Sequence, residues 1–174
     1  MSKSKEEALI QCAIAAHFGN KNIVIPNISF ARISCRIEKY DKGGCFIGYK
    51  YPFSGVKHEA DLILINENDY LTEVEIKVSY SDFLADFKKK EKHLTKYTKA
   101  VYYAFLHNMY KENEGKIKTV LFEKFPGAGV IIVDAEEMAV DIIKNAEYFN
   151  VEKIPIEVKI GLMRIGCQKW WRRK

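Results

Sequence analysis

Apolar residues recur along the chain at spacings that predict its first elements. In residues 4–18 they return at helical intervals behind two early acidic residues, which predicts an N-terminal helix. Residues 22–37 are rich in isoleucine and alternate over much of their length, which predicts a strand interrupted near Pro26. A glycine-containing turn at 40–44 leads into the apolar run at 45–51, which we expect to be the antiparallel partner strand.

Four further runs are apolar enough to form buried strands. The runs at 60–65 and 71–78 are apolar on both faces, which is typical of central strands that are covered on each side. The polar residues 66–70 between them predict a turn, so the two runs should form a hairpin. The runs at 100–106 and 129–133 predict two more buried strands.

The segment after the hairpin predicts a helix that carries many charged residues. Ser79 or Ser81 can cap its N-terminus with a side-chain hydroxyl. Four apolar residues would form its buried stripe: Phe83, Phe87, Leu94 and Tyr97. We therefore expect one helix to include all four.

The remaining residues predict two helices and a less regular end. Residues 113–124 favour a helix. Asp134 and Glu137 lie three residues apart and predict an N-terminal capping box for a helix that reaches about Glu147. Residues 154–166 are expected to form a strand or irregular structure. This order of elements predicts an α/β fold in which a mixed β-sheet is flanked by helices.

Composition and hydropathy limit the class of protein. The 174 residues are 48% hydrophobic, which suits one domain with a core of about 4–147 and a basic, aromatic extension of about 148–174. The apolar runs are too short to span a membrane, and residues 1–11 lack a signal-peptide pattern, so we expect a cytoplasmic protein without membrane contacts. The four cysteines have no metal-site spacing and are expected to be buried small side chains.

Basic residues are clustered, although the formal net charge is only +5. Six lysines lie within residues 88–99, and the last six residues hold four basic side chains beside Trp170 and Trp171. Such clusters can follow a phosphate backbone, although a solvated helix face and a frayed chain end would have the same composition. The candidates for nucleic-acid binding are Lys88, Lys89, Lys92, Arg172 and Arg173.

The predicted hairpin carries three charged residues that its geometry should bring together. A five-residue turn would pair Ile65 with Leu71 and place Asp61 opposite Glu75. Because side chains alternate along a strand, Lys77 would lie on the same face as Glu75. Two carboxylates and an ammonium among apolar residues are costly to desolvate unless they bind something.

The chemistry of this trio suits a divalent cation. Close carboxylates repel each other unless a cation lies between them or one of them is protonated. Mg²⁺ (or Mn²⁺) prefers hard oxygen ligands, keeps several waters and often binds through one or two carboxylates and a substrate phosphate. A metal there would polarise a phosphoryl oxygen, while Lys77 would orient the attacking water or stabilise charge on the phosphate. The trio therefore predicts phosphodiester hydrolysis.

The hairpin motif also resembles that of a known superfamily. Asp61 followed after thirteen residues by Glu75-Ile76-Lys77 matches the pattern of the PD-(D/E)XK nucleases, and residues 58–135 are similar to the MmcB-like DNA repair family. This resemblance implies a restriction-endonuclease-like fold and a metal-dependent DNA endonuclease or repair nuclease. It implies that Asp61, Glu75 and the Ile76 backbone carbonyl hold the metal. It also implies that Lys77 is the catalytic lysine.

Other residues match this family less directly. The accessory candidates are Glu6 on the first helix, Glu73, Ser79 and Asp82. Asp86 and Lys88 complete the helix start S-x-x-D-F-x-x-D-x-K that the resemblance implies. The chain departs from the family at residues 58–59, where an arginine is expected, and by several added residues at 92–98.

Simpler interpretations stay open beside these. Glu73 would equally be a solvent-side charge, and His58 an ordinary surface or loop histidine. Asp82 and Asp86 lie at a helix N-terminus, where acidic side chains are favourable in any protein. For the whole protein, the alternatives are a catalytically inactive DNA-binding or assembly module of the same fold, or a structural protein whose carboxylates form ion pairs. We expect DNA as the partner, with a homodimer as a candidate assembly.

Overall fold

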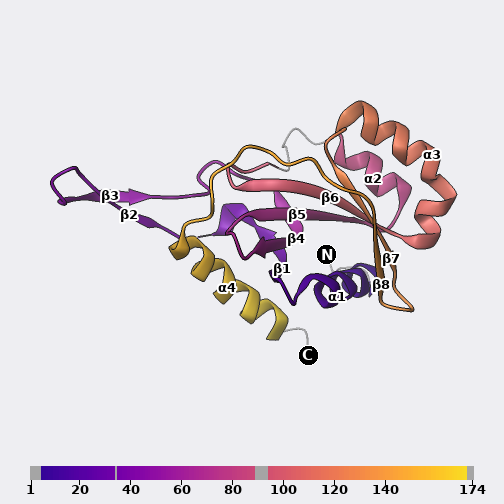
Figure 1. Ribbon diagram of the computed structural model, residues 1–174, viewed down its shortest axis with the longest axis horizontal. Coiled ribbons are helices and arrows are strands. Elements are labelled where there is room, and N and C mark those ends of the chain that lie inside the picture. The colour runs from indigo at the N-terminus through magenta and orange to yellow at the C-terminus, as the bar shows by residue number, and fades with distance from the viewer. Residues whose placement is uncertain (1–4, 34, 89–93, 172–174) are drawn as a thin grey trace.

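The computed structural model describes residues 5–33, 35–88 and 94–171 (Figure 1). The strands are β1 (Asn22–Ser29), β2 (Ile37–Tyr40), β3 (Phe46–Lys50), β4 (Glu59–Asn66), β5 (Leu71–Lys77), β6 (Thr98–Leu106), β7 (Gly129–Asp134) and β8 (Ala139–Lys144). The helices are α1 (Lys5–Phe18), the 3-10 helix η1 (Phe30–Arg32), α2 (Tyr80–Asp86), α3 (His107–Lys124) and α4 (Ile156–Trp171).

The larger sheet has six strands in the order β1-β4-β5-β6-β7-β8, and β2 and β3 form a separate two-stranded sheet. Strands β5, β6 and β7 are parallel, whereas β1–β4, β4–β5 and β7–β8 are antiparallel pairs. The predicted α/β fold with a mixed sheet flanked by helices is therefore confirmed. Ile65 pairs with Leu71, so the predicted five-residue turn is confirmed as well.

Alternation along the central strands divides the core between the two faces of the large sheet. Leu62 and Val74 pack against Ile10 of α1 on one face. Ile63 packs against Leu162 of α4 on the other face. The strand register places the aromatic cluster of β6 on this second face, where α2 and α3 cover it. None of the helices in the ranges given above is long and apolar enough to cross a membrane.

Most of the first predicted elements are confirmed with small changes at their ends. Helix α1 and the β2–β3 hairpin occur where the apolar pattern predicts them. The first predicted strand is divided, because β1 ends at Ser29 and η1 separates it from β2. Helix α3 begins at His107, well before its expected start at residue 113.

The helix after the hairpin is shorter than its apolar stripe predicts. Ser79 caps α2 as expected, since its Oγ accepts the Asp82 amide hydrogen at 3.2 Å. Helix α2 ends at Asp86, so Leu94 and Tyr97 do not belong to it. Tyr97 lies in a turn before β6 and is buried against α4 and its neighbours. The prediction of one helix through all four apolar residues is therefore wrong.

The predicted helix that reaches Glu147 is also wrong, because residues 139–144 form strand β8 beside β7. Asp134 does act as a cap, but of a turn: its Oδ1 accepts the amide hydrogens of Glu136 and Glu137 at 3.0 and 3.2 Å. Met138 then adopts a positive φ of 54°, which ends any helical continuation. Aspartate serves turns and helix starts equally well, so the local signal was ambiguous.

The C-terminal residues do not form the expected strand or irregular segment, because most of them lie in helix α4. Its Val158 and Leu162 are one turn apart and fully buried, and Ile165 packs beside them. They contact Ile25 of β1, so α4 is part of the hydrophobic core. The spacing of these residues is helical, and a basic, aromatic composition obscured it.

Helix α4 also supplies hydrogen-bond donors to the edge strand β1. Trp170 Nε1 donates to the Val24 carbonyl at 3.0 Å, and the Lys169 ammonium donates to the Asn27 carbonyl. Pro26, which has no amide hydrogen, lies between Val24 and Asn27 in β1. The end of α4 therefore lies along this edge of the sheet.

The cysteines do not behave as the expected buried side chains. Cys12, Cys45 and Cys167 are exposed, and Cys35 is half-buried. All four are free thiols.

Candidate active site

Strands β4 and β5 separate on one side of their hairpin, and Asp61 lies at the point of separation. The described ladder between them ends at Leu62 and Val74, and Asp61 is the preceding residue of β4. Asp61 Oδ2 accepts the Ile76 amide hydrogen at 2.9 Å. Asp61 and Glu75 therefore do not form the predicted ladder pair. Instead, the Asp61 carboxylate accepts a hydrogen bond from the backbone of β5.

Lys77 lies at the centre of a buried group of polar side chains. Its Nζ lies 3.1 Å from Glu75 Oε2 and 3.3 Å from Asp86 Oδ1. Asp86 Oδ2 in turn accepts a hydrogen bond from the Tyr103 hydroxyl at 3.1 Å. We call Asp61, Glu75, Lys77, Asp86 and Tyr103 the Lys77 cluster. Lys77 is only 3% exposed and Glu75 only 2%, so the cluster is largely shielded from bulk water.

Charge and burial act against each other on Lys77. Burial alone would lower the pKa of its ammonium, but the charges of Glu75, Asp86 and Asp61 outweigh it and raise that pKa above its ordinary value. Burial, followed by the charge of Asp86, also raises the pKa of Tyr103. Lys77 is therefore a cation and Tyr103 a hydrogen-bond donor at neutral pH.

Regular secondary structure explains how the members of the cluster meet. Glu75 and Lys77 are two residues apart on β5 and point to the same face. Tyr103 is the aligned neighbour of Glu75 on the parallel strand β6. Asp86 lies three residues after the fully buried Phe83 on α2, so it faces the same side of that helix.

The predicted trio of Asp61, Glu75 and Lys77 thus meets in one place, whereas Asp86 and Tyr103 were not predicted as members. Asp86 was expected at the start of a helix, where acidic residues are favourable, but it is the last residue of α2. Its spacing from Phe83 on the buried side of the helix was the signal that could have identified it. Tyr103 carried no local signal, because the alignment of β6 with β5 decides its position.

The oxygen atoms of the Lys77 cluster suit a magnesium ion that keeps several water ligands better than an ion whose ligands all come from protein side chains. Asp61, Glu75 and the Ile76 carbonyl offer hard oxygen ligands where the strands separate. Within residues 5–33, 35–88 and 94–171, no group of three or more His, Cys, Asp or Glu side chains is arranged to hold a metal ion. A metal bound by these two carboxylates and one carbonyl would leave most of its coordination to water or to a substrate.

Glu73 belongs to a second buried network on the same face of β5. It is fully buried, so its interpretation as a solvent-side charge is wrong. Its carboxylate accepts a hydrogen bond from Thr98 Oγ1 at 2.6 Å and lies 3.0 Å from His58 Nε2. His58 lies in the loop before β4, as one of its two simpler interpretations expects, but it is only 8% exposed and is therefore not a surface histidine. Burial raises the pKa of Glu73, although the contacts with His58 and Thr98 oppose the shift.

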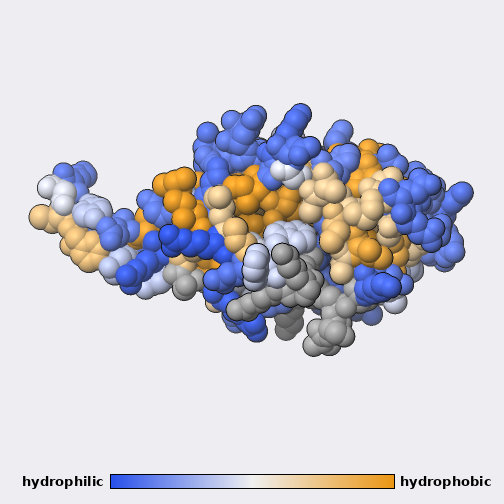
Figure 2. Space-filling view, turned by 90° about the horizontal axis from the view of Figure 1, so that it is seen from below, coloured by the Kyte–Doolittle hydropathy of each residue, from blue (hydrophilic) through white to orange (hydrophobic). Residues whose placement is uncertain are grey.

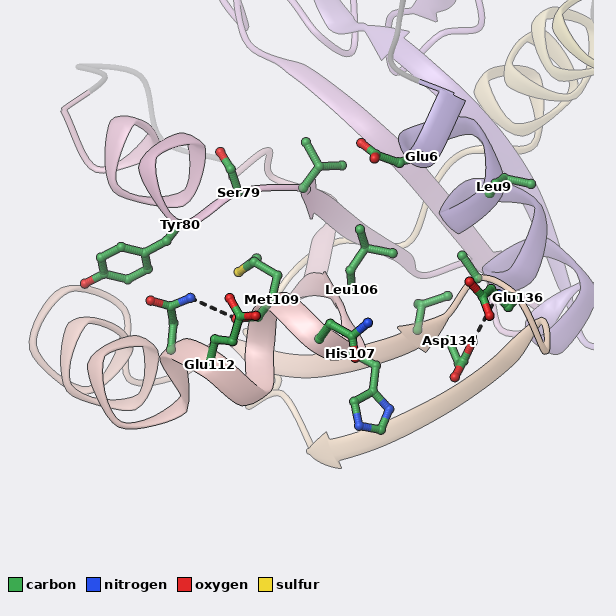
Figure 3. A pocket seen from close by; sticks show the side chains of 15 residues that line it. Glu6, Leu9, Ser79, Tyr80, Leu106, His107, Met109, Glu112, Asp134 and Glu136 are labelled. Atoms are coloured by element: carbon green, nitrogen blue, oxygen red, sulfur yellow. Dashed lines mark hydrogen bonds between the residues drawn. The ribbon is translucent and has the colours of Figure 1, made fainter.

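The accessory candidates Glu6 and Ser79 line a cavity of about 740 Å³ beside the ends of β5, β6 and β7. Figure 3 shows both side chains across the cavity from His107, which begins α3. Asp82 is exposed in the first turn of α2, where its amide donates to Ser79. The simpler interpretation, helix capping, thus accounts for the described contacts of Ser79 and the position of Asp82.

The candidates for nucleic-acid binding are only partly described. Lys88 is exposed just after α2. The other four lie outside the described residues: Lys89, Lys92, Arg172 and Arg173. Their predicted role stays a prediction.

Comparisons with known proteins concern the fold alone. No protein-family model matches the chain, and no curated protein sequence matches it. The chain is similar in structure to a protein of unknown function from Silicibacter pomeroyi, with 16% sequence identity and a TM-score of 0.58. The match covers 99% of this chain and 90% of that one. At this level of identity the similarity shows a shared fold.

Proposed function

We propose that this protein is a metal-dependent deoxyribonuclease that hydrolyses phosphodiester bonds at the Lys77 cluster. The observation that carries the proposal is the convergence of Glu75 and Asp86 on the buried Lys77 ammonium, next to the point where Asp61 binds the β5 backbone at Ile76. Burying charges in this way is costly, and such clusters are concentrated at functional sites. A role in DNA repair and assembly as a homodimer are further parts of the proposal.

Each member of the cluster has a distinct role in this proposal. Asp61 and Glu75, with the Ile76 carbonyl, would hold Mg²⁺ or Mn²⁺. When bound, the metal supplies Lewis-acid chemistry, which polarises a phosphoryl oxygen and lowers the pKa of a bound water. Lys77 stabilises negative charge on the phosphate, since its pKa is raised and it stays protonated. Asp86 holds the Lys77 ammonium in place and is itself held by Tyr103.

The cavity beside the ends of β5, β6 and β7 adjoins the cluster along the chain, although none of the cluster side chains lines it. It is lined by Val78, Ser79 and Tyr80, which directly follow Lys77 in the chain. It lies beyond the carboxyl ends of the parallel strands, where open α/β sheets commonly bind their ligands.

The experiment is cleavage of labelled single-stranded, double-stranded and branched DNA with Mg²⁺ and with Mn²⁺. We expect Glu75→Gln and Lys77→Met to lower the cleavage rate at least about 100-fold, since each removes a group that acts on the transition state. Glu67→Gln is the matched control, because Glu67 is an exposed acid in the turn of the same hairpin. Full activity of both cluster variants would exclude the proposal.

The second candidate function is a DNA-binding module of the same fold that does not cleave. The observation in its favour is the near-complete burial of Glu75 and Lys77, which a structural ion pair would share. Titration of Mg²⁺ followed by calorimetry separates the two functions. A non-cleaving module should take up metal no better than a variant with both Asp61→Ala and Glu75→Ala.

A further inference from the structure

The β2–β3 hairpin forms an arm that stands apart from the six-stranded sheet. We define the arm as residues 36–51, which include both strands and the turn between them. It projects from one end of the molecule and shares no strand pairing with the large sheet (Figure 1). An isolated two-stranded hairpin is marginally stable in water, so an arm that persists needs a reason beyond its own stability.

Large apolar side chains are exposed along this arm. Tyr40 is 55% exposed, Phe46 51%, Ile47 62% and Tyr51 54%. Figure 2 shows apolar and hydrophilic side chains side by side at this end of the molecule. A concentration of exposed apolar side chains on a projecting element is typical of a binding surface.

The aromatic rings are held in place by one another. The Phe46 ring centroid lies 6.0 Å from that of Tyr40 and 5.1 Å from that of Tyr49, both with edge-to-face geometry. The Arg36 guanidinium lies 4.1 Å from the centroid of the Tyr49 ring. Rings positioned in this way lose little conformational entropy when a planar group stacks on them.

The charges of the arm suit a polyanion. Arg36, Lys39, Lys42 and Lys50 are its basic side chains, and Glu38 and Asp41 are its acids. Both acids have internal roles. Asp41 Oδ1 accepts the amide hydrogens of Gly43 and Cys45 in the turn, and Glu38 accepts the Tyr40 hydroxyl.

The base of the arm brings two ammonium groups together. Lys96, which precedes β6, interacts with Lys50 and lowers the pKa of its ammonium, whereas the charge of Glu152 opposes that shift. Lys96 also pairs with Glu152 at 2.9 Å. Like charges held at short range are stabilised by a bound phosphate, because it interacts favourably with both.

We propose that the β2–β3 arm binds a single-stranded segment of nucleic acid, with bases stacked on its exposed rings and phosphates near its lysines. The proposal deepens the proposed function, on which it rests for the choice of nucleic acid as the occupant. Exposed rings favour an unpaired base, which offers a face for stacking, over the edges of paired bases, which are recognised through hydrogen bonds. Exposed lysines beside the rings complete the pattern of single-strand binding surfaces.

The test is fluorescence anisotropy with a labelled oligothymidylate of about 12 nucleotides, a length within the usual range of single-strand sites. EDTA is present throughout, so the result does not depend on whether the Lys77 cluster cleaves DNA. We expect Phe46→Ala to weaken binding by about 5- to 100-fold, the effect of losing one stacked base. Phe122→Ala is the control, because this phenylalanine of α3 is 79% exposed and lies outside the arm.

A second pair of variants tests the charges. We expect replacement of Lys39 and Lys42 by glutamine to reduce the slope of log K against log salt by about 0.7 for each lysine. Lys111→Gln on α3 is the control, since Lys111 is an exposed lysine outside the arm. This pair keeps the proposal testable if Phe46→Ala alters the shape of the hairpin.

Three results would overturn the proposal. In the first, the arm variants bind the oligonucleotide as well as their controls do. In the second, a duplex of equal length binds more tightly than the single strand, and Phe46→Ala has no effect on either. In the third, light scattering shows a dimer that Phe46→Ala converts to a monomer without changing DNA binding, so the arm binds a second copy of the chain.

Discussion

Lys77 is surrounded by acidic groups that would be left without their ammonium if it were replaced. We expect Lys77→Met, which keeps the length of the side chain, to lower the free energy of unfolding by about 3–5 kcal/mol at pH 7. The reason is that Glu75 and Asp86 would keep their burial and lose a charge partner. Urea unfolding measures the change. Lys111→Met, at an exposed position of α3, should differ from the native protein by about 0.5 kcal/mol or less.

Glu73 gives the protein a pH dependence that the Lys77 cluster does not explain. Because burial raises its folded-state pKa, the folded protein holds a proton that the unfolded chain releases near the ordinary value of 4.5. The stabilising effect of Glu73 is therefore complete below that value and falls as pH rises through the raised folded-state pKa. Glu73→Gln should remove this fall. Urea unfolding at pH values from below 4.5 upward measures the free energy of unfolding of both proteins. Parallel pH profiles of the native protein and Glu73→Gln would contradict a raised pKa of Glu73.

Physical rules that act over a few residues predicted part of the candidate site. The period of two along β5 placed Glu75 and Lys77 together, and this holds in the structure. The position of Asp61 depended on where β4 leaves β5, which no local pattern reports. Burial of Glu73 depended on His58 and Thr98, which are 15 and 25 residues away in sequence. Long-range contacts of this kind decide which polar residues are buried.

Among the elements, substitutions in helix α4 test how much the C-terminal part of the chain contributes to the free energy of unfolding. Leu162→Ala should lower the free energy of unfolding by about 2–5 kcal/mol, because it leaves a cavity between α4 and the sheet. Met163→Ala is the control on the same helix, since Met163 is 41% exposed. Chemical denaturation of both variants measures the difference. Equal, small effects would mean that α4 is not packed as described.

Central elements of this fold are easier to predict from the sequence than elements at its edges. The central strands are short apolar runs bounded by turn residues, and their length and their β-branched residues favour a buried strand over a buried helix. Strand β8 was mistaken for a helix, because Asp134 can start either a helix or a turn and β8 is largely exposed. Helix α4 was missed because only Val158, Leu162 and Gly166 are fully buried along it. Edge elements depend on their neighbours for their conformation.

Across the whole molecule, we expect the β2–β3 arm to unfold locally more often than the central strands do. In hydrogen exchange, we expect amides of β2 and β3 to exchange near the rate of an unfolded peptide. Amides of β4, β5 and β6 should exchange last, because these central strands are covered on both faces. Protection of the arm equal to that of β5 in the protein alone would contradict this order. Added oligothymidylate should slow exchange in the arm selectively.

The two edge strands of the large sheet differ in how easily another chain could pair with them. Trp170 and Lys169 occupy main-chain oxygens of β1, and Pro26 removes a donor from the same strand. A foreign strand arriving there would have to displace a tryptophan and a lysine to reach those two carbonyl oxygens. Within the large sheet, polymerisation by strand addition is therefore a greater hazard at β8, on the opposite margin, than at β1.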